Sequence, residues 1–171
     1  NDATPAKTVT VVVKDNGNGT LTATVKGADG QGAGTTFTNT YKVGSTTANI
    51  PVTKKLDVPE GLTGPDITEK FTFTLADWDE DETNSPLPDE TELKNPDADG
   101  GAVTFGPIAY DMPGTYTYTV TEEGTVDGVT NDATPAKTVT VVVVDNKDGT
   151  LTATVKGADG TEEDPSENTT F

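Results

Sequence analysis

The chain has 171 residues, with 29 acidic residues against 11 basic ones and a formal net charge of −18. Nucleic acids and anionic membranes both bind positive charge, so this composition argues against electrostatic binding to either. The absence of His and Cys argues against a zinc site and excludes a thiol nucleophile and a Ser-His-Asp triad, so we expect no cofactor and no metal.

A near-identical repeat opens and closes the chain. Residues 1–30 recur as residues 131–160 with three differences: Lys14/Val144, Gly17/Lys147 and Asn18/Asp148. The spacing of 130 residues is too long for a solenoid unit and fits a whole domain repeated in series. We therefore expect residues 1–41 to be the C-terminal hairpin of a preceding repeat and 42–48 to be a linker. Residues 49–171 would be a nearly complete domain that lacks the end of its final strand.

Strands with apolar residues at every second position follow one another along the chain. The first hairpin alternates from Val9 to Val25 across an Asn/Gly-rich turn, and the second copy does so from Val139 to Val155. Between them, KFTFTLADW (70–78) and GTYTYTVTEE (114–123) alternate in the same way. Helix signals are nearly absent. The pattern predicts an all-β protein, an antiparallel immunoglobulin-like β-sandwich, with loops at the acidic stretches 77–83 and 89–100.

Three polar residues break this alternation. It turns a Lys, an Asn and a Glu toward the expected core: Lys54 in ANIPVTKKLDV, Asn39 in TTFTNTY and Glu122 in GTYTYTVTEE. Each of these side chains is costly to bury without a partner. Alternatively, each one sits at a strand end, where alternation stops or the side chain reaches water. Trp78, the only Trp, is expected to pack at an edge of the core, and its exposure would instead indicate a ligand contact.

The order of these motifs resembles that of pilin isopeptide-linkage domains in Gram-positive surface proteins. The motifs are VTKKLD, FTFTL, YTYTVTEE, the V-x-V-x-V-x-DN hairpin and FTNTY, and together they cover essentially the whole chain. The resemblance implies an immunoglobulin-like domain in which a first-strand Lys bonds covalently to a last-strand Asn, assisted by a buried acid. On this chain it assigns Lys54 and Asn39 to the crosslink and Glu122 to the catalytic proton shuttle.

This chemistry agrees with what burial does to the two ionisable groups. An amine attacks a carboxamide carbon only when neutral, and burial disfavours the charged forms of amines and carboxylates alike. A protonated carboxyl can polarise the amide oxygen and pass protons. The fold supplies proximity, which is worth about 7–11 kcal/mol of barrier. The result is a single-turnover crosslink with loss of ammonia, not an enzyme acting on substrates.

The chain departs from the family pattern in one respect. The second repeat carries Lys54 and Glu122, but its own Asn would lie beyond Phe171, whereas Asn39 belongs to the preceding repeat. Three outcomes stay open: no bond, an Asn39–Lys54 bond after the leading hairpin folds back, or an Asn39–Lys54 bond between neighbouring chains. The last is a strand exchange, which a hairpin with open edges favours.

The function expected from these features is that of a structural stalk or pilus-type module. We expect an extracellular, cell-wall-attached protein, of which this chain is a piece with its targeting signals elsewhere, and no membrane insertion in this segment. Its partners would be neighbouring repeats of the same polypeptide. A ligand-binding adhesin module is the alternative, and glycan or matrix-protein binding would distinguish it. A hydrolase with paired carboxylates is disfavoured because most acidic residues lie in polar loops.

Overall fold

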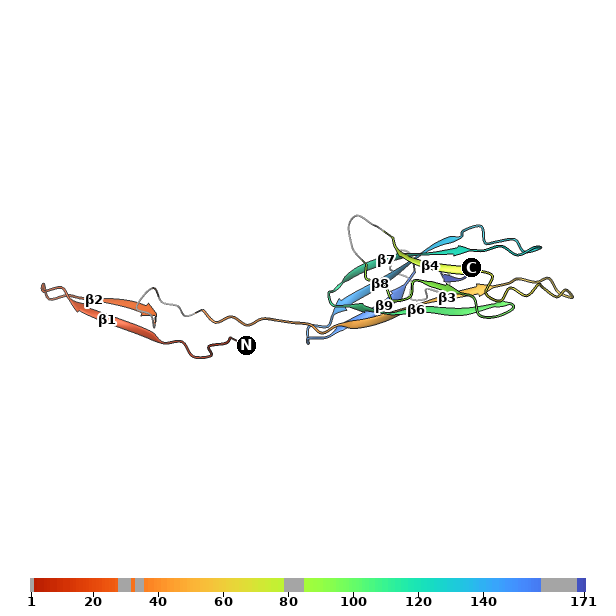
Figure 1. Cartoon of the computed structure of the whole chain (residues 1–171). Helices are drawn as coiled ribbons and strands as arrows, with labels where there is room; N and C mark the ends of the chain where they lie inside the picture. Colours follow the sequence, from red (N-terminus) through yellow and green to blue (C-terminus); the bar gives the residue numbers. More distant parts are fainter. Residues whose placement is uncertain (1, 28–31, 33–35, 79–84, 158–168) are drawn as a thin grey trace. The chain divides into compact units, whose positions relative to one another are not determined.

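The computed structural model describes residues 2–27, 32, 36–78, 85–157 and 169–171. It divides into two compact units, Asn1–Lys42 and Val43–Phe171 (Figure 1). The boundary falls at the start of the range expected to be a linker, and the first strand of the second unit begins within that range, at Thr46.

The first unit contains a two-stranded antiparallel hairpin. Its strands β1 (Val9–Asp15) and β2 (Leu21–Gly27) pair with Val11 opposite Val25. Within this unit the valines of β1 are exposed, Val11 and Val13 to 57% each. The hairpin predicted from the sequence is present, and no described part of the same unit covers the valines of β1.

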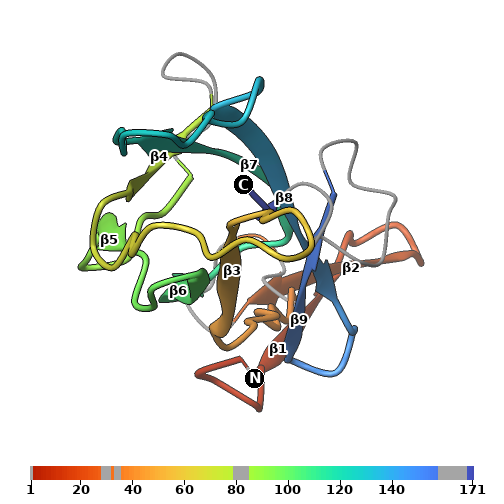
Figure 2. The same cartoon turned by 90° about the vertical axis from the view of Figure 1, so that its right-hand side faces the viewer.

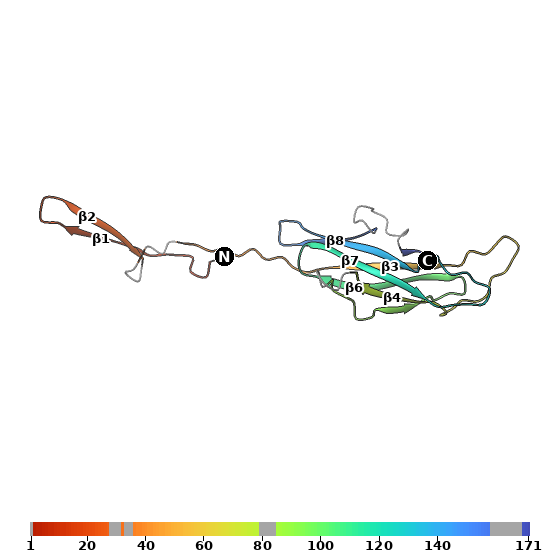
Figure 3. The same cartoon turned by 90° about the horizontal axis from the view of Figure 1, so that it is seen from above.

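In its described residues, the second unit is a β-sandwich of seven strands. They are β3 (Thr46–Lys55), β4 (Thr72–Asp77), β5 (Glu92–Lys94), β6 (Gly100–Tyr110), β7 (Gly114–Glu123), β8 (Ala136–Asp145) and β9 (Leu151–Lys156). One layer pairs β3 with β6, and the other has the order β5-β4-β7-β8-β9, with antiparallel neighbours throughout. Figure 2 shows β3 and β6 on one side of the unit and β4 and β7 on the other, and Figure 3 shows β4, β7 and β8 running along it.

The core lies between these two layers and is built from the alternating positions of the strands. Fully buried side chains come from every long strand: Ile50, Val52, Phe73, Phe105, Ile108, Tyr118, Val120, Val139 and Val141. Tyr110 and Tyr118 share a hydrogen bond of 2.9 Å between their hydroxyl oxygens, so the polar ends of these rings are satisfied inside the core. The immunoglobulin-like all-β fold expected from the sequence is confirmed.

The last described residues add a parallel edge to β3. The Phe171 N–H donates to the carbonyl of Thr53 at 2.9 Å, and the Lys55 N–H donates to the carbonyl of Phe171 at 2.8 Å. The Phe171 ring packs on Phe73, with centroids 5.3 Å apart. The first and last segments of the unit are thus neighbours, and they run in the same direction.

The structure departs in part from the loops that the sequence predicted at the acidic stretches 77–83 and 89–100. β5 lies inside 89–100, where a loop was expected, because Phe73 and Leu93 pair across the edge of the sheet. The strand β6 was not predicted at all, although it is the longest of the unit. Residues 79–83 of the other acidic stretch lie outside the described residues. Trp78, expected to pack at a core edge, is 60% exposed, so that prediction is wrong.

Candidate crosslink site

Lys54 and Glu122 meet inside the second unit. Lys54 ends the buried face of β3 that begins at Ala48, and Glu122 ends the buried face of β7. The Lys54 Nζ lies 2.7 Å from the Glu122 Oε1, and the two side chains are 5% and 1% exposed. Alternation in the sequence predicted both side chains to point inward, and the sandwich brings them together from opposite layers.

The carboxylate of Glu122 can accept further hydrogen bonds. Although Lys54 is within ion-pair distance, neither Glu122 oxygen accepts a well-aligned hydrogen bond from the described residues. The 2.7 Å separation makes Lys54 and Glu122 a close ion pair, and the second carboxylate oxygen, Oε2, has no partner among the described residues. A buried polar atom without a partner is costly, and each such atom in a native structure calls for an explanation, of which a catalytic role is one.

Aromatic and polar residues hold this pair in place. The Lys54 Nζ lies over the Phe71 ring, 4.1 Å from its centroid, a favourable position for a cation away from water. The buried Asn95 fixes Phe71, since its Oδ1 accepts the Phe71 N–H at 3.0 Å and its Nδ2 donates to the carbonyl of Ile67 at 2.8 Å. The sequence did not indicate either role, because both depend on segments that are distant along the chain.

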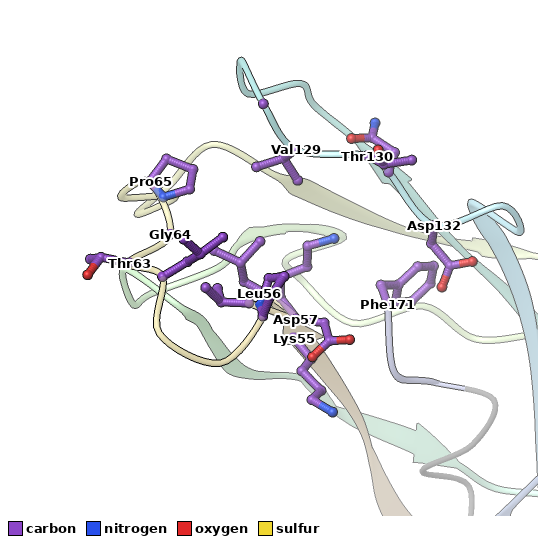
Figure 4. Close-up of a pocket in the computed structure, with 16 residues that line it drawn as sticks. Lys55, Leu56, Asp57, Thr63, Gly64, Pro65, Val129, Thr130, Asp132 and Phe171 are labelled. Carbon is purple, nitrogen blue, oxygen red and sulfur yellow. The ribbon is translucent and has the colours of Figure 1, made fainter.

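A groove of about 500 Å³ opens beside this pair. Its walls come from Lys54–Pro59, residues 62–65, residues 128–132 and Phe171. Figure 4 shows Phe171 and Asp132 on one side, with Leu56, Gly64 and Pro65 across from them. Phe171 pairs with Thr53 and Lys55 at the C-terminal end of β3. A chain continuing past Phe171 along β3 would therefore enter this groove.

A family model matches the chain over residues 1–42 and 50–171, and its description is a Spy0128-like isopeptide containing domain, FctA. The chain belongs to this family. No curated protein matched the chain. The family is a structural, pilin-type one, so the expected resemblance to pilin isopeptide domains is confirmed, and membership implies a Gram-positive surface or pilus protein. In the described part of the chain, no helix is long and apolar enough to cross a membrane.

The third residue that the sequence predicted for the crosslink, Asn39, lies in the first unit. Its Oδ1 accepts the N–H of Asp2 at 3.3 Å, and the neighbouring Thr38 N–H donates to the Asp2 Oδ2 at 2.8 Å. The structure therefore brings together two of the three expected crosslink residues, Lys54 and Glu122, within one unit. It places Asn39 in the other unit, in contact with a loop that the sequence reasoning did not single out.

That loop occurs again beside the Lys54–Glu122 pair. Residues 131–137 repeat residues 1–7. Hydrogen bonds from the backbone and side chain of Thr134 and from Lys137 lower the pKa of Asp132 to about 2, so its carboxylate is ionised at neutral pH. The Lys137 Nζ is 3.1 Å from the Asp132 Oδ2 and stands over the Phe171 ring, 4.9 Å from its centroid. The sequence repeat was the available signal for this loop.

Proposed function

We propose that the chain is a stalk module of a cell-surface protein, and that Lys54 of its second unit forms an isopeptide bond with the Asn of an F-T-N-T-Y strand. The observation that supports this best is the buried Lys54–Glu122 pair, with 2.7 Å between Nζ and Oε1, at the mouth of the groove into which the last strand would continue. In this proposal the module sits outside the cell, attached to the wall.

The reaction follows from the groups at the site. The neutral Lys54 amine attacks the carboxamide carbon of the Asn, and a C–N bond forms while the carbonyl oxygen takes up negative charge. The Glu122 carboxyl, which has taken up the proton that the Lys54 ammonium gives up within the pair, donates to that oxygen and carries a proton from the attacking nitrogen to the departing one. The old C–N bond breaks and ammonia leaves. Atoms balance without any oxidant or metal, and the product is a secondary amide.

The test measures the intact masses of two chains, each under denaturing conditions. One is the chain itself, and the other is extended past Phe171 by Thr-Asn-Thr-Tyr, the residues that follow Phe37. We expect the extended chain to be lighter than its sequence by one ammonia, and peptide mapping should join Lys54 to the added Asn. Lys54→Arg in the extended chain should keep the full mass, since an arginine stays protonated.

A matched control replaces the neighbouring Lys55, which points to solvent, by Arg. It should lose ammonia like the unsubstituted extended chain. If the extended chain keeps its full mass while circular dichroism shows it to be folded, the proposed crosslink is wrong.

We also propose that copies of this chain exchange their N-terminal hairpins. The sequence of β1–β2 is nearly that of β8–β9 and pairs in the same register, Val11 with Val25 as Val141 with Val155. Yet Val141 is fully buried and Val11 is 57% exposed. A second copy whose β8–β9 hairpin has opened offers a site of matching shape to β1–β2. The exchange replaces each contact by its equivalent and also places Asn39 in the groove of the partner.

Substitutions on the two faces of β1 test the proposed exchange of hairpins. Val11→Asp should abolish the oligomers that light scattering detects at high chain concentration, because the equivalent Val141 is buried. Val12→Asp, a matched change on the other face, should leave them, since Val142 in the second copy is only half-buried. A chain that stays monomeric at every concentration, or a Val11→Asp variant that assembles normally, contradicts the exchange.

A further inference from the structure

The first unit shows what the loop of residues 1–7 does with the residues after Phe37. The Asp2 carboxylate accepts the Thr38 N–H at 2.8 Å through Oδ2, and the Thr4 N–H at 2.8 Å through Oδ1. The Asp2 N–H points at the Asn39 side chain, 3.3 Å from its Oδ1. One residue therefore holds both the backbone before Asn39 and the carbonyl oxygen of the Asn39 carboxamide.

The second copy of the loop has the same internal arrangement. The Asp132 Oδ1 accepts the Thr134 N–H at 2.7 Å and the Thr134 hydroxyl at 2.8 Å. The Lys137 ammonium pairs with Asp132 and covers Phe171, as the Lys7 ammonium pairs with Asp2 and covers Phe37, 5.5 Å from its ring centroid. Asp132 and Phe171 are thus arranged like Asp2 and Phe37.

This second loop is also tied to the acid of the crosslink site. The Glu122 N–H donates to the carbonyl of Pro135 at 2.7 Å, and the Asn131 Nδ2 donates to the carbonyl of Gly124 at 2.7 Å. Asp132 lies between these two attachments and lines the groove that Lys54 and Phe171 also line. The loop therefore has a fixed place beside Glu122.

We propose that Asp132 positions the reacting Asn: its carboxylate accepts the N–H of the residue after Phe171, and its N–H donates to the carboxamide oxygen of the next residue, the Asn that Lys54 attacks. This inference rests on the proposed crosslink. It adds a second donor to the oxygen on which negative charge develops, and a carbonyl oxygen has lone pairs for both the Glu122 hydroxyl and the Asp132 N–H.

The arrangement gives the two parts of Asp132 separate tasks. The carboxylate fixes the depth at which the last strand enters the groove, and so sets the distance from the Lys54 Nζ to the carboxamide carbon. The backbone N–H stabilises the tetrahedral intermediate by an oriented dipole, as oxyanion-binding amides do. A misplacement of the reacting atoms by about 1 Å slows such a reaction by up to about a hundredfold.

The experiment follows the rate of ammonia loss in the extended chain. The chain is synthesised in a cell-free system, translation is stopped, and samples are quenched in denaturing acid at intervals and weighed by mass spectrometry. We expect Asp132→Ala to slow crosslinking by roughly ten- to a hundredfold. Asp132→Asn should restore part of the rate, because its single amide oxygen replaces only one of the two carboxylate oxygens that accept from Thr134 and from the incoming strand.

The repeat supplies the matched control, Asp2→Ala, in the same loop of the unit without a Lys54 counterpart; this variant should crosslink at the unchanged rate. Thermal unfolding of the unextended variants separates positioning from folding. Equal rates for Asp132→Ala and Asp2→Ala would overturn the proposal. The proposal would also be overturned if both Asp132 variants crosslinked slowly only in proportion to their loss of folded chain. If the unsubstituted extended chain loses no ammonia, the proposed crosslink itself fails, and the role of Asp132 fails with it.

Discussion

Replacing Lys54 by Met is expected to lower the free energy of unfolding by about 3–5 kcal/mol, because it leaves Glu122 buried without a counter-charge. Both side chains are at most 5% exposed, so water does not replace the lost partner. The loss of the cation over Phe71 adds to this cost. Urea unfolding of the chain, followed by circular dichroism, measures the difference.

A double variant separates the pair from the packing around it. Lys54→Met combined with Glu122→Leu removes both charges, and we expect most of the lost stability to return, since apolar replacements of a buried ion pair are often neutral or stabilising. Lys55→Met, on the outward face of the same strand, should change stability by less than about 0.5 kcal/mol. If Lys54→Met alone barely changes the free energy of unfolding, or if the double variant is as unstable as the single one, Lys54 and Glu122 do not form a buried ion pair.

If the pair does not stabilise the fold more than apolar residues would, its presence needs another reason. The unsatisfied oxygens of Glu122 supply one, because they leave capacity for a third group. A site built only for stability would satisfy those atoms. The oxygens without a partner are therefore consistent with the proposed crosslink site in its unreacted state.

The sequence predicted the parts of the fold that depend on local alternation. The strand expected at 114–123 is β7, Gly114–Glu123, and both hairpins are present. The inward directions of Lys54 and Glu122 followed from the same period of two, since the buried face of a strand continues to its end. Their mutual contact was implied only by the family resemblance, because alternation says nothing about which strands face each other.

The rest of the site depends on contacts between distant segments. β6 was missed because its Gly and Pro residues interrupt the strand signal, and it becomes a strand through its pairing with β3. The sequence did not indicate the role proposed for the loop 131–137, because the Asp-Ala-Thr turn has the pattern of an ordinary turn. In the first copy of this turn, Asp2 forms hydrogen bonds with Thr38 and Asn39, more than thirty residues away, and only these contacts indicate which residues the turn binds.

Formation of the crosslink is expected to raise the free energy of unfolding of the extended chain by about 5 kcal/mol. The bond closes a loop that runs from Lys54 in β3 through the whole sandwich to the last strand, and a loop of that length restricts the unfolded chain strongly. The comparison is with an extended chain that has Ala in place of the added Asn, which keeps the strand but cannot react. Urea midpoints of the two chains give the difference, and equal midpoints would contradict it.

The same bond decides how the unit responds to tension. β3 is the first strand of the unit, and the segment that ends at Phe171 pairs with it in parallel, so a pull on the two ends shears these neighbours past each other. A covalent link between them carries that force directly from the first strand to the last. Strands β4 to β9 then lie outside the loaded path, and we expect single-molecule pulling of the crosslinked chain to show no extension from their unfolding. The Ala-substituted chain should unfold and lengthen under the same force.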